Sequence, residues 1–429
     1  MCGNQPSGQE VERERFDEPP LGFKNPPPCV LPFAQSLPES VVSMSKSQSQ
    51  SRRLKLIHPL AGCTLPGWLK LLTTYGGVDS IGWPQAASVS LIAALGFPLR
   101  MYERLRFGRA IAAQKLDPPP VFIIGHWRSG TTNMHNHLLR DSQFGHLSFL
   151  HCQTPWAFLT AGSLAHRLFA KFAPKTRPMD NVEFGLDEPM SEDFALGAMT
   201  DITHYHSYYF PRHGDSIFHR TILFDGLSET DVERWQQTYR YLLQKVAVAN
   251  DGKQLLLKNP AHSGRIPTIL KMFPNAKFIH VYRNPFVVIS STLKLMDRFL
   301  HLLALQRHDW ESVREACLVR YQLLMDRLLH DKNLIPPNQL FEVSHEEMTS
   351  RPMEVLERAY SHLSLPGFEA AQPRQQAYAE SLVNYETNRY GFDDATIAHW
   401  TPFLKVAIDR WGYEPPVNRS AENLAQPRV

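Results

Sequence analysis

The chain has 429 residues and a formal net charge of +3 at pH 7. Its length exceeds the roughly 250–300 residues at which a single hydrophobic core stops growing, so we expect one large domain with helical insertions. The small charge, without a concentrated basic stripe, excludes an ordinary nucleic-acid binder. The five cysteines are scattered and include no Cys-x-x-Cys pair, which favours reduced thiols in the cytoplasm over a disulfide framework.

Residues 1–52 are predicted to be disordered. They contain proline pairs and the polar run Ser43–Ser51. Such a composition buries too little apolar surface to offset the loss of chain entropy. No basic segment followed by an apolar one opens the chain, so we expect no signal peptide.

A helical region is expected over 53–116, and its most apolar part is Ala86–Leu99. Gly96 and Pro98 interrupt that run, which is shorter than the roughly 20 residues needed to span a bilayer. Two interpretations of 86–109 are open. The simpler one is a helix docked on the main domain, and the other is an interfacial helix that contacts an anionic membrane surface. The second interpretation depends on a set of four arginines: Arg100, Arg104, Arg106 and Arg109.

The main domain is expected over 117–415 and begins with a strand at Val121–Gly125. A continuous apolar run of this kind is typical of a strand buried on both faces of a parallel sheet. Thr131–Arg140 is then predicted to be the crossover helix. Residues 416–429 remain as a C-terminal tail.

The loop between this strand and helix resembles a phosphate-binding loop. Gly125 and Gly130 enclose four residues, but Thr131 replaces the lysine that normally follows the second glycine. That lysine contacts the β- and γ-phosphates in phosphoryl transfer. The loop therefore predicts a nucleotide whose reacting group is not a γ-phosphate.

Strand and helix patterns alternate along the rest of the chain. Ser228 is predicted to cap a helix that runs to Asn250, with Asp231 favouring the dipole at its start. The alternation predicts an α/β fold, a three-layer P-loop-like fold with a central parallel sheet and large helical insertions. The further strands are expected at 254–258, 277–282 and 340–344, and the further helices near 264–272, 284–300, 311–330 and 352–363.

Polar segments follow three of the predicted strands: 125–132, Lys258–His262 and Arg283–Asn284. Since ligands lie at the carboxyl ends of parallel strands, we expect these segments to converge on one crevice. The loop offers N–H groups and hydroxyls for one phosphate. Arg283, with Ser291 eight residues later, offers a second phosphate site. A nucleotide phosphorylated at two positions would use both.

These two phosphate segments resemble those of sulfotransferases. Gly-x-x-Arg-Ser-Gly-Thr-Thr is similar to the 5′-phosphosulfate loop of that family, and Tyr-Arg-Asn-Pro with the later serine is similar to its 3′-phosphate motif. Arg177–Val182 and Tyr385–Gly391 also fit a bacterial-type branch. The resemblance implies 3′-phosphoadenylyl sulfate as co-substrate, with no metal required. It implies donor contacts from Arg128, Ser129, Gly130, Thr131 and Thr132 at the 5′-phosphosulfate and from Arg283 and Ser291 at the 3′-phosphate.

Sulfonate transfer needs cations that stabilise developing charge and a base that accepts the acceptor proton. By resemblance, Lys258 contacts the transferring sulfonate, whereas Pro260 stands where cytosolic sulfotransferases have a catalytic histidine. Two interpretations of the base are open: His262, and the acidic pair Glu192 and Asp193. Simpler roles are a histidine bonded to backbone at a helix start and acids that complement a helix dipole.

The predicted function is thus transfer of a sulfonate group to a hydroxyl or amine acceptor. The apolar and aromatic insertion around 150–225 favours a small-molecule or lipid-like acceptor. The alternatives are a P-loop nucleotide kinase, which the missing lysine disfavours, and a non-catalytic nucleotide-binding protein. The expected location is the cytoplasm, with peripheral contact to the inner face of a membrane if the second interpretation of 86–109 holds.

Overall fold

The computed structural model describes residues 57–160, 185–382 and 390–416. Residues 53–429 form one compact unit. The predicted disordered segment 1–52 lies outside the described residues, as do the family-like segment Arg177–Val182 and most of Tyr385–Gly391.

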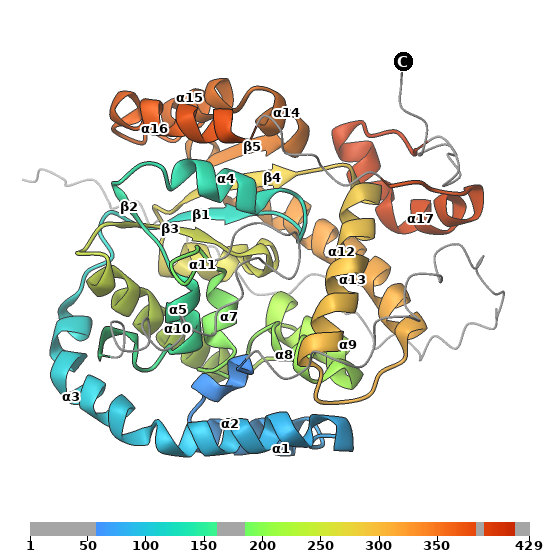
Figure 1. The fold of residues 1–429 in the computed structure, drawn as a ribbon. Helices are drawn as coiled ribbons and strands as arrows, with labels where there is room; N and C mark the ends of the chain where they lie inside the picture. The colour runs from blue at the N-terminus through green and yellow to red at the C-terminus, as the bar shows by residue number, and fades with distance from the viewer. Residues whose placement is uncertain (1–56, 161–184, 383–389, 417–429) are drawn as a thin grey trace, which may run out of the picture. The chain divides into compact units, whose positions relative to one another are not determined.

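A five-stranded parallel sheet forms the centre of this unit (Figure 1). β1 is the central strand, between β3 and β4, so the carboxyl ends of these three strands are neighbours. The predicted strands 254–258, 277–282 and 340–344 are confirmed to the residue, whereas the two-residue strand β2 was not predicted. In spatial order the strands are β2 (Phe144–Gly145), β3 (Gln254–Lys258), β1 (Val121–Ile124), β4 (Lys277–Tyr282) and β5 (Leu340–Ser344).

Helices cover both faces of the sheet, which confirms the three-layer α/β fold (Figure 1). Because side chains alternate along a strand, Val121 and Ile123 pack into one apolar cluster and Phe122 and Ile124 into another. The first cluster includes α4 (Thr131–Leu138), α14 (His345–Ser350) and α15 (Pro352–His362). The second includes α10 (Glu229–Ala249), α11 (Ile266–Met272), α12 (Pro285–Leu303), α13 (Trp310–Asp331) and α17 (Asp394–Trp411).

The sequence patterns predicted the positions of most of these helices correctly. Ser228 caps α10 as predicted, because its Oγ accepts from the N–H of Asp231 at 3.1 Å. α11 begins later than expected, because a 3₁₀ turn at Pro260–Gly264 precedes it. α16 (Phe368–Ser381) and α17 were not predicted.

The insertion between β2 and α10 consists of short helices: α5 (Phe149–Gln153), α7 (Glu192–Leu196), α8 (His206–Tyr209), α9 (Gly214–Phe218) and a π-helical turn at His219–Leu223. In Figure 1, α7 and α8 lie between the sheet and the N-terminal helices. Those helices are α1 (Leu65–Thr74), α2 (Trp83–Leu95) and α3 (Phe97–Ala113).

α1 and α2 are fixed to the domain by an apolar cluster. Trp68 of α1 and Val89 of α2 share this cluster with Tyr208 of α8 and Leu300 of α12. None of the described helices is by itself long and apolar enough to cross a membrane. By length and composition alone, the pair Ser80–Leu95 and Phe97–Ala113 together would be long and apolar enough to cross one, with a bend of 43° between the two helices.

Candidate active site

The loop after β1 depends on its two glycines for its path. Gly125 has φ 141° and Gly130 has φ 100°, which is backbone that favours glycine. A Cβ on Gly125 would lie 2.3 Å from the carbonyl oxygen of Val281, and one on Gly130 would lie 2.3 Å from Nδ1 of His345. The missing side chains let the loop lie directly against β4 and α14.

We expect Gly125→Ala to lower the free energy of unfolding by roughly 1–3 kcal/mol, because the strained φ and the Val281 carbonyl leave no room for a methyl group. Gly108→Ala is the matched control. Gly108 lies within α3 with no atom close to an added Cβ, so this change should raise stability by about 0.5–1 kcal/mol. Urea unfolding measures the free energy of unfolding of both variants. A Gly125→Ala protein as stable as the wild type would contradict the close contact between the loop and β4.

Two buried serines fasten the loop to the sheet. Ser129 Oγ donates to the carbonyl of Val281 at 2.7 Å, and its N–H donates to the carbonyl of His126 at 3.2 Å. Ser263 Oγ accepts from the N–H of Gly125 at 2.9 Å and donates to its carbonyl at 3.0 Å. Both donors of Ser129 are thus engaged within the protein, so Ser129 shapes the loop where the sequence predicted a ligand contact. Ser263 was missed, because the predicted polar segment stopped one residue before it.

The start of α4 has the features that favour an anion. α4 begins at Thr131 directly after Gly130, and no side chain from the described residues caps it. The first N–H groups of a helix have no partner within it, and the dipole there favours negative charge. Thr131 is buried at this point and Thr132 is half-buried. Both residues thus lie in the first turn of α4, and their contact with a phosphate stays a prediction.

The two predicted phosphate segments meet in the structure. Arg128 Nε donates to Ser291 Oγ at 2.8 Å, and Arg283 Nη1 donates to the carbonyl of Arg128 at 3.3 Å. Arg128 holds a positive φ of 70°, which is uncommon for a residue with a Cβ. The structure thus brings together Arg128, Arg283 and Ser291, which lie far apart in the sequence.

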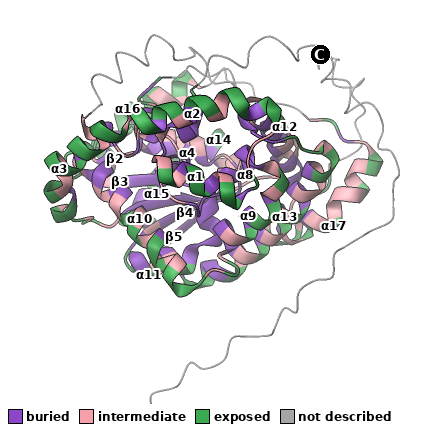
Figure 2. Ribbon diagram, turned by 90° about the horizontal axis from the view of Figure 1, so that it is seen from below, coloured by how far each residue is buried: buried purple, intermediate pink, exposed green. Residues whose placement is uncertain are grey.

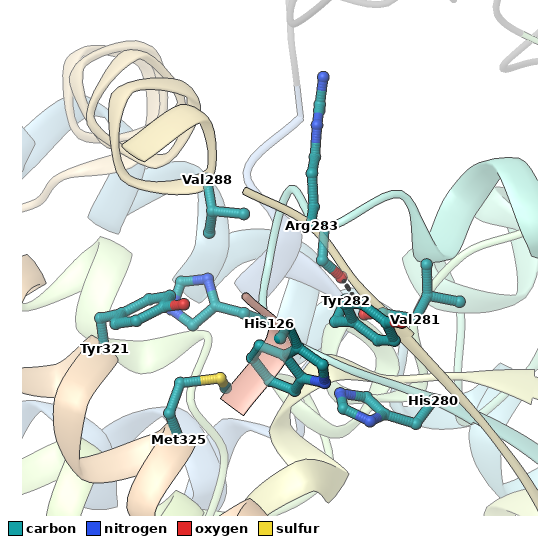
Figure 3. Close-up of a pocket in the computed structure, with 10 residues that line it drawn as sticks. His126, His280, Val281, Tyr282, Arg283, Val288, Tyr321 and Met325 are labelled. Atoms are coloured by element: carbon teal, nitrogen blue, oxygen red, sulfur yellow. Dashed lines mark hydrogen bonds between the residues drawn. The ribbon is translucent and has the colours of Figure 1, made fainter. Parts of the chain in front are cut away.

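A small cavity lies beside these residues, lined by His126, Tyr321 and the end of β4 (Figure 3). Its volume of about 10 Å³ suits a single water molecule. Tyr282 and Trp411 stack at its edge, with ring centroids 4.8 Å apart and planes at 7°. The Arg283 side chain points away from this cavity in Figure 3, so its guanidinium group lies outside the cavity.

Glu192 lies at the start of α7, next to the carboxyl end of β3. Its Oε1 accepts from the N–H of Lys258 at 3.1 Å. Its Oε2 lies 3.9 Å from Nε2 of His262 and has no hydrogen bond to any of the described residues. Burial raises the pKa of Glu192 to about 7, although the charge of Lys258 opposes the rise. A carboxyl with an unbonded oxygen and a pKa near neutrality is suited to proton transfer.

Asp193 has a different environment from its neighbour. Arg265 binds both carboxylate oxygens, with Nη1 at 2.7 Å from Oδ1 and Nη2 at 3.1 Å from Oδ2. Asn259 Nδ2 donates to Oδ1 at 3.0 Å, and the N–H of His204 donates to Oδ2 at 3.2 Å. Burial alone would raise the pKa of Asp193, but the Arg265 guanidinium more than offsets it and holds the pKa far below its usual range. The predicted acidic pair thus separates into a structural anchor and a carboxyl available for chemistry.

His262 is buried among aromatic side chains. Its ring centroid lies 5.7 Å from that of Phe122 and 5.2 Å from that of Tyr239, whose hydroxyl is 2.8 Å from Nε2. Burial lowers the pKa of His262 to about 3, and Arg265 lowers it further. His262 and Glu192 are both buried, but Nε2 of His262 is engaged by Tyr239 whereas Oε2 of Glu192 has no hydrogen bond to any of the described residues. Of the two interpretations of the base that the sequence left open, these contacts favour Glu192 over His262.

Residues 119–370 match the family model described as the sulfotransferase family. The chain is 29% identical over 379 residues to omega-hydroxy-beta-dihydromenaquinone-9 sulfotransferase Stf3 of Mycobacterium bovis, which covers 87% of this chain and 96% of that protein.

Two crystal structures have a similar fold. Sulfotransferase STF9 of Mycobacterium avium gives a TM-score of 0.60 at 18% identity, covering 82% of this chain and 97% of that one. Sulfotransferase STF1 of Mycobacterium tuberculosis H37Rv gives 0.54 at 16% identity, covering 73% and 85%.

Proposed function

The chain belongs to the sulfotransferase family, and from this premise we propose how its residues perform the reaction and which acceptor class it uses. It is an enzyme that moves a sulfonate group from 3′-phosphoadenylyl sulfate to a hydroxyl or amine acceptor. The observation that carries our proposal is the direct contact between the two phosphate segments, through Arg128, Ser291 and Arg283.

We propose that the donor is held at both ends. The uncapped start of α4 and Arg128 bind the 5′-phosphosulfate, and Arg283 with Ser291 binds the 3′-phosphate. The chemistry fits, because an uncapped helix start and guanidinium groups are the usual protein partners of phosphate. With Lys258 at the end of β3, these cations supply the positive charge, so we propose a reaction without a metal ion.

In the proposed reaction Glu192 acts as the base. The acceptor oxygen forms a bond to sulfur, the bond from sulfur to the 5′-phosphate oxygen breaks, and the hydroxyl proton passes to Oε2 of Glu192. Lys258 and Arg128 stabilise the charge that develops on the sulfonate and on the leaving phosphate. Adenosine 3′,5′-bisphosphate and the sulfated acceptor are the products.

The donor assignment predicts a specific loss in Arg283→Ala. Affinity for adenosine 3′,5′-bisphosphate, measured by calorimetry, should fall roughly 10- to 150-fold, because the loss of one charge-assisted hydrogen bond costs about 1.5–3 kcal/mol. Affinity for adenosine 5′-monophosphate should hardly change, because that nucleotide has no 3′-phosphate.

Arg212→Ala is the matched control for this measurement. Arg212 forms an exposed ion pair with Asp79 at 2.9 Å, and its loss should leave both affinities unchanged. If Arg283→Ala lowered the affinity for both nucleotides equally, the proposal that Arg283 binds the 3′-phosphate would be wrong. No fall for either would overturn the donor site.

We propose a lipid-like hydroxyl acceptor. The support is the group of aromatic side chains in the insertion next to the loop. Trp127 of the loop contacts His204 with ring centroids 4.6 Å apart, and His204 contacts Tyr208. The similarity to a sulfotransferase named for a hydroxylated menaquinone adds to it. A transfer screen with radiolabelled donor tests the class against a hydroxylated prenyl quinone, a phenol and a sugar. Preference for the sugar would overturn it.

We also propose a cytoplasmic location at the inner face of a membrane. The support is that Cys63, Cys152 and Cys317 are free and buried thiols, as is usual in a reducing compartment. Fractionation of the native cells tests this directly.

A further inference from the structure

α2 and α3 expose apolar side chains on the side that faces solvent (Figure 2). A surface helix of a globular protein normally turns its apolar residues inward. Here the buried residues are few, namely Val89 and Ala93 in α2 and Glu103 and Ile111 in α3. Six large side chains are instead 56–77% exposed: Trp83, Leu91, Leu95, Phe97, Tyr102 and Leu105. We call this surface the α2–α3 face.

The α2–α3 face extends over both helices. Leu91 and Leu95 are four residues apart in α2, and Tyr102 and Leu105 are three apart in α3, so each pair lies on one side of its own helix. The bend at the break is only 43°. Arg100 joins the helices, because its guanidinium donates to the carbonyl of Ala93. An exposed apolar surface of this extent marks a contact with a protein or a membrane.

The charges around this face are of one sign. Glu103 is the only acidic residue between Trp83 and Ala113, and it is fully buried. Its carboxylate pairs with Lys245, and its Oε2 accepts from the N–H of Thr160 at 2.8 Å. Glu103 therefore adds no negative charge to the exposed surface of α3. α3 carries a set of three exposed cations: Arg104, Arg106 and Arg109.

We propose that the α2–α3 face docks on the surface of an anionic bilayer. Apolar side chains flanked by arginines match the boundary between lipid headgroups and acyl chains, where arginine meets lipid phosphate. Trp83 and Tyr102 are the residue types enriched at that boundary. The inner side of α2 packs on the cluster that contains Tyr208 of α8, so the docking face lies on the same side of the sheet as α7 and Glu192 (Figure 1). This proposal goes beyond the proposed reaction and holds whether the acceptor is a lipid or not.

The test is co-sedimentation of the full chain with phosphatidylcholine vesicles, with and without phosphatidylglycerol, in the absence of donor and acceptor. The wild type should bind the anionic vesicles more tightly. The double variant Leu95→Ser, Leu105→Ser should lose about tenfold or more for each leucine on both kinds of vesicle. The double variant Arg104→Gln, Arg106→Gln should lose about fivefold for each arginine, on anionic vesicles only.

Matched controls come from other surfaces of the chain. Leu334 is 55% exposed in the 3₁₀ turn after α13, and Arg351 precedes α15. Leu334→Ser and Arg351→Gln should leave binding to vesicles unchanged. All variants should keep the wild-type affinity for adenosine 3′,5′-bisphosphate, which separates loss of docking from loss of the fold or the donor site.

Three outcomes would overturn the proposal. The first is a wild type that sediments with neither kind of vesicle. The second is equal binding to both kinds that the arginine variant does not change. The third is a dimer in analytical ultracentrifugation that the leucine variant converts to monomers, because a second copy would then cover the α2–α3 face.

Discussion

Glu192→Gln is expected to lower kcat for sulfonate transfer by roughly 10²–10⁴-fold, the usual cost of losing a positioned base. The glutamine Oε1 can still accept from the N–H of Lys258, as Glu192 does at 3.1 Å, so the local structure is preserved. The amide cannot accept a proton from an acceptor hydroxyl. Initial rates at saturating donor and acceptor measure the loss, and the affinity for adenosine 3′,5′-bisphosphate should remain that of the wild type.

The pH dependence gives the same prediction a second readout. Burial raises the pKa of Glu192 to about 7, and the base acts as the carboxylate, so kcat/KM should rise with pH through about 7 and level off above it. A glutamate with an ordinary pKa of about 4.3 would give no rise in that range. The Glu192→Gln protein should show no such limb.

The same titration also affects stability, with the opposite sign. Folding raises the pKa of Glu192, so its contribution to stability is present below the unfolded pKa and is lost as pH rises through about 7. The wild type should therefore lose stability relative to Glu192→Gln over this window. If Glu192→Gln kept the wild-type rate while a stably folded His262→Gln lost it, the histidine would be restored as the base.

Asp193→Asn is expected to cost about 3–5 kcal/mol of unfolding free energy, because Arg265 would remain buried without its counter-charge. The side chain of Arg265 is 1% exposed and has no access to water that could compensate. Chemical denaturation measures the loss. The matched control is Asp409→Asn, which removes an exposed i,i+4 pair with Lys405 and should have no measurable effect.

Acid should reduce the difference between Asp193→Asn and the wild type. The folded pKa of Asp193 is depressed, so its contribution to stability is present above the unfolded pKa of about 3.9 and is lost as pH falls below it. An Asp193→Asn protein with wild-type stability and a rate as low as that of Glu192→Gln would contradict the structural role.

Continuous apolar strands and local spacing were the parts of this protein that could be predicted. β3 and β4 are mainly apolar runs, and β5 alternates buried and half-buried residues. The Arg283-to-Ser291 spacing lies within one corner of strand and helix. β2 has only two residues, which is too short to give a pattern.

The different environments of Glu192, Asp193 and His262 could not be predicted, because they depend on contacts between distant segments. Arg265 lies 72 residues from Asp193, and no motif connects them. Tyr239 lies in the middle of α10 and engages His262 only once the helix packs on β3. The sequence shows which groups can titrate, whereas burial and partners decide which of them can accept a proton.

If the donor binds as proposed, the bond between Arg128 and Ser291 connects the two halves of its site. A nucleotide that fills one half perturbs a side chain that belongs to the other, so the affinities of the two halves are thermodynamically linked, and each must influence the other by the same factor. With such linkage, a nucleotide that lacks the phosphate at one end would leave a side chain at the other end misplaced. Discrimination against incomplete nucleotides would then show in turnover as well as in affinity.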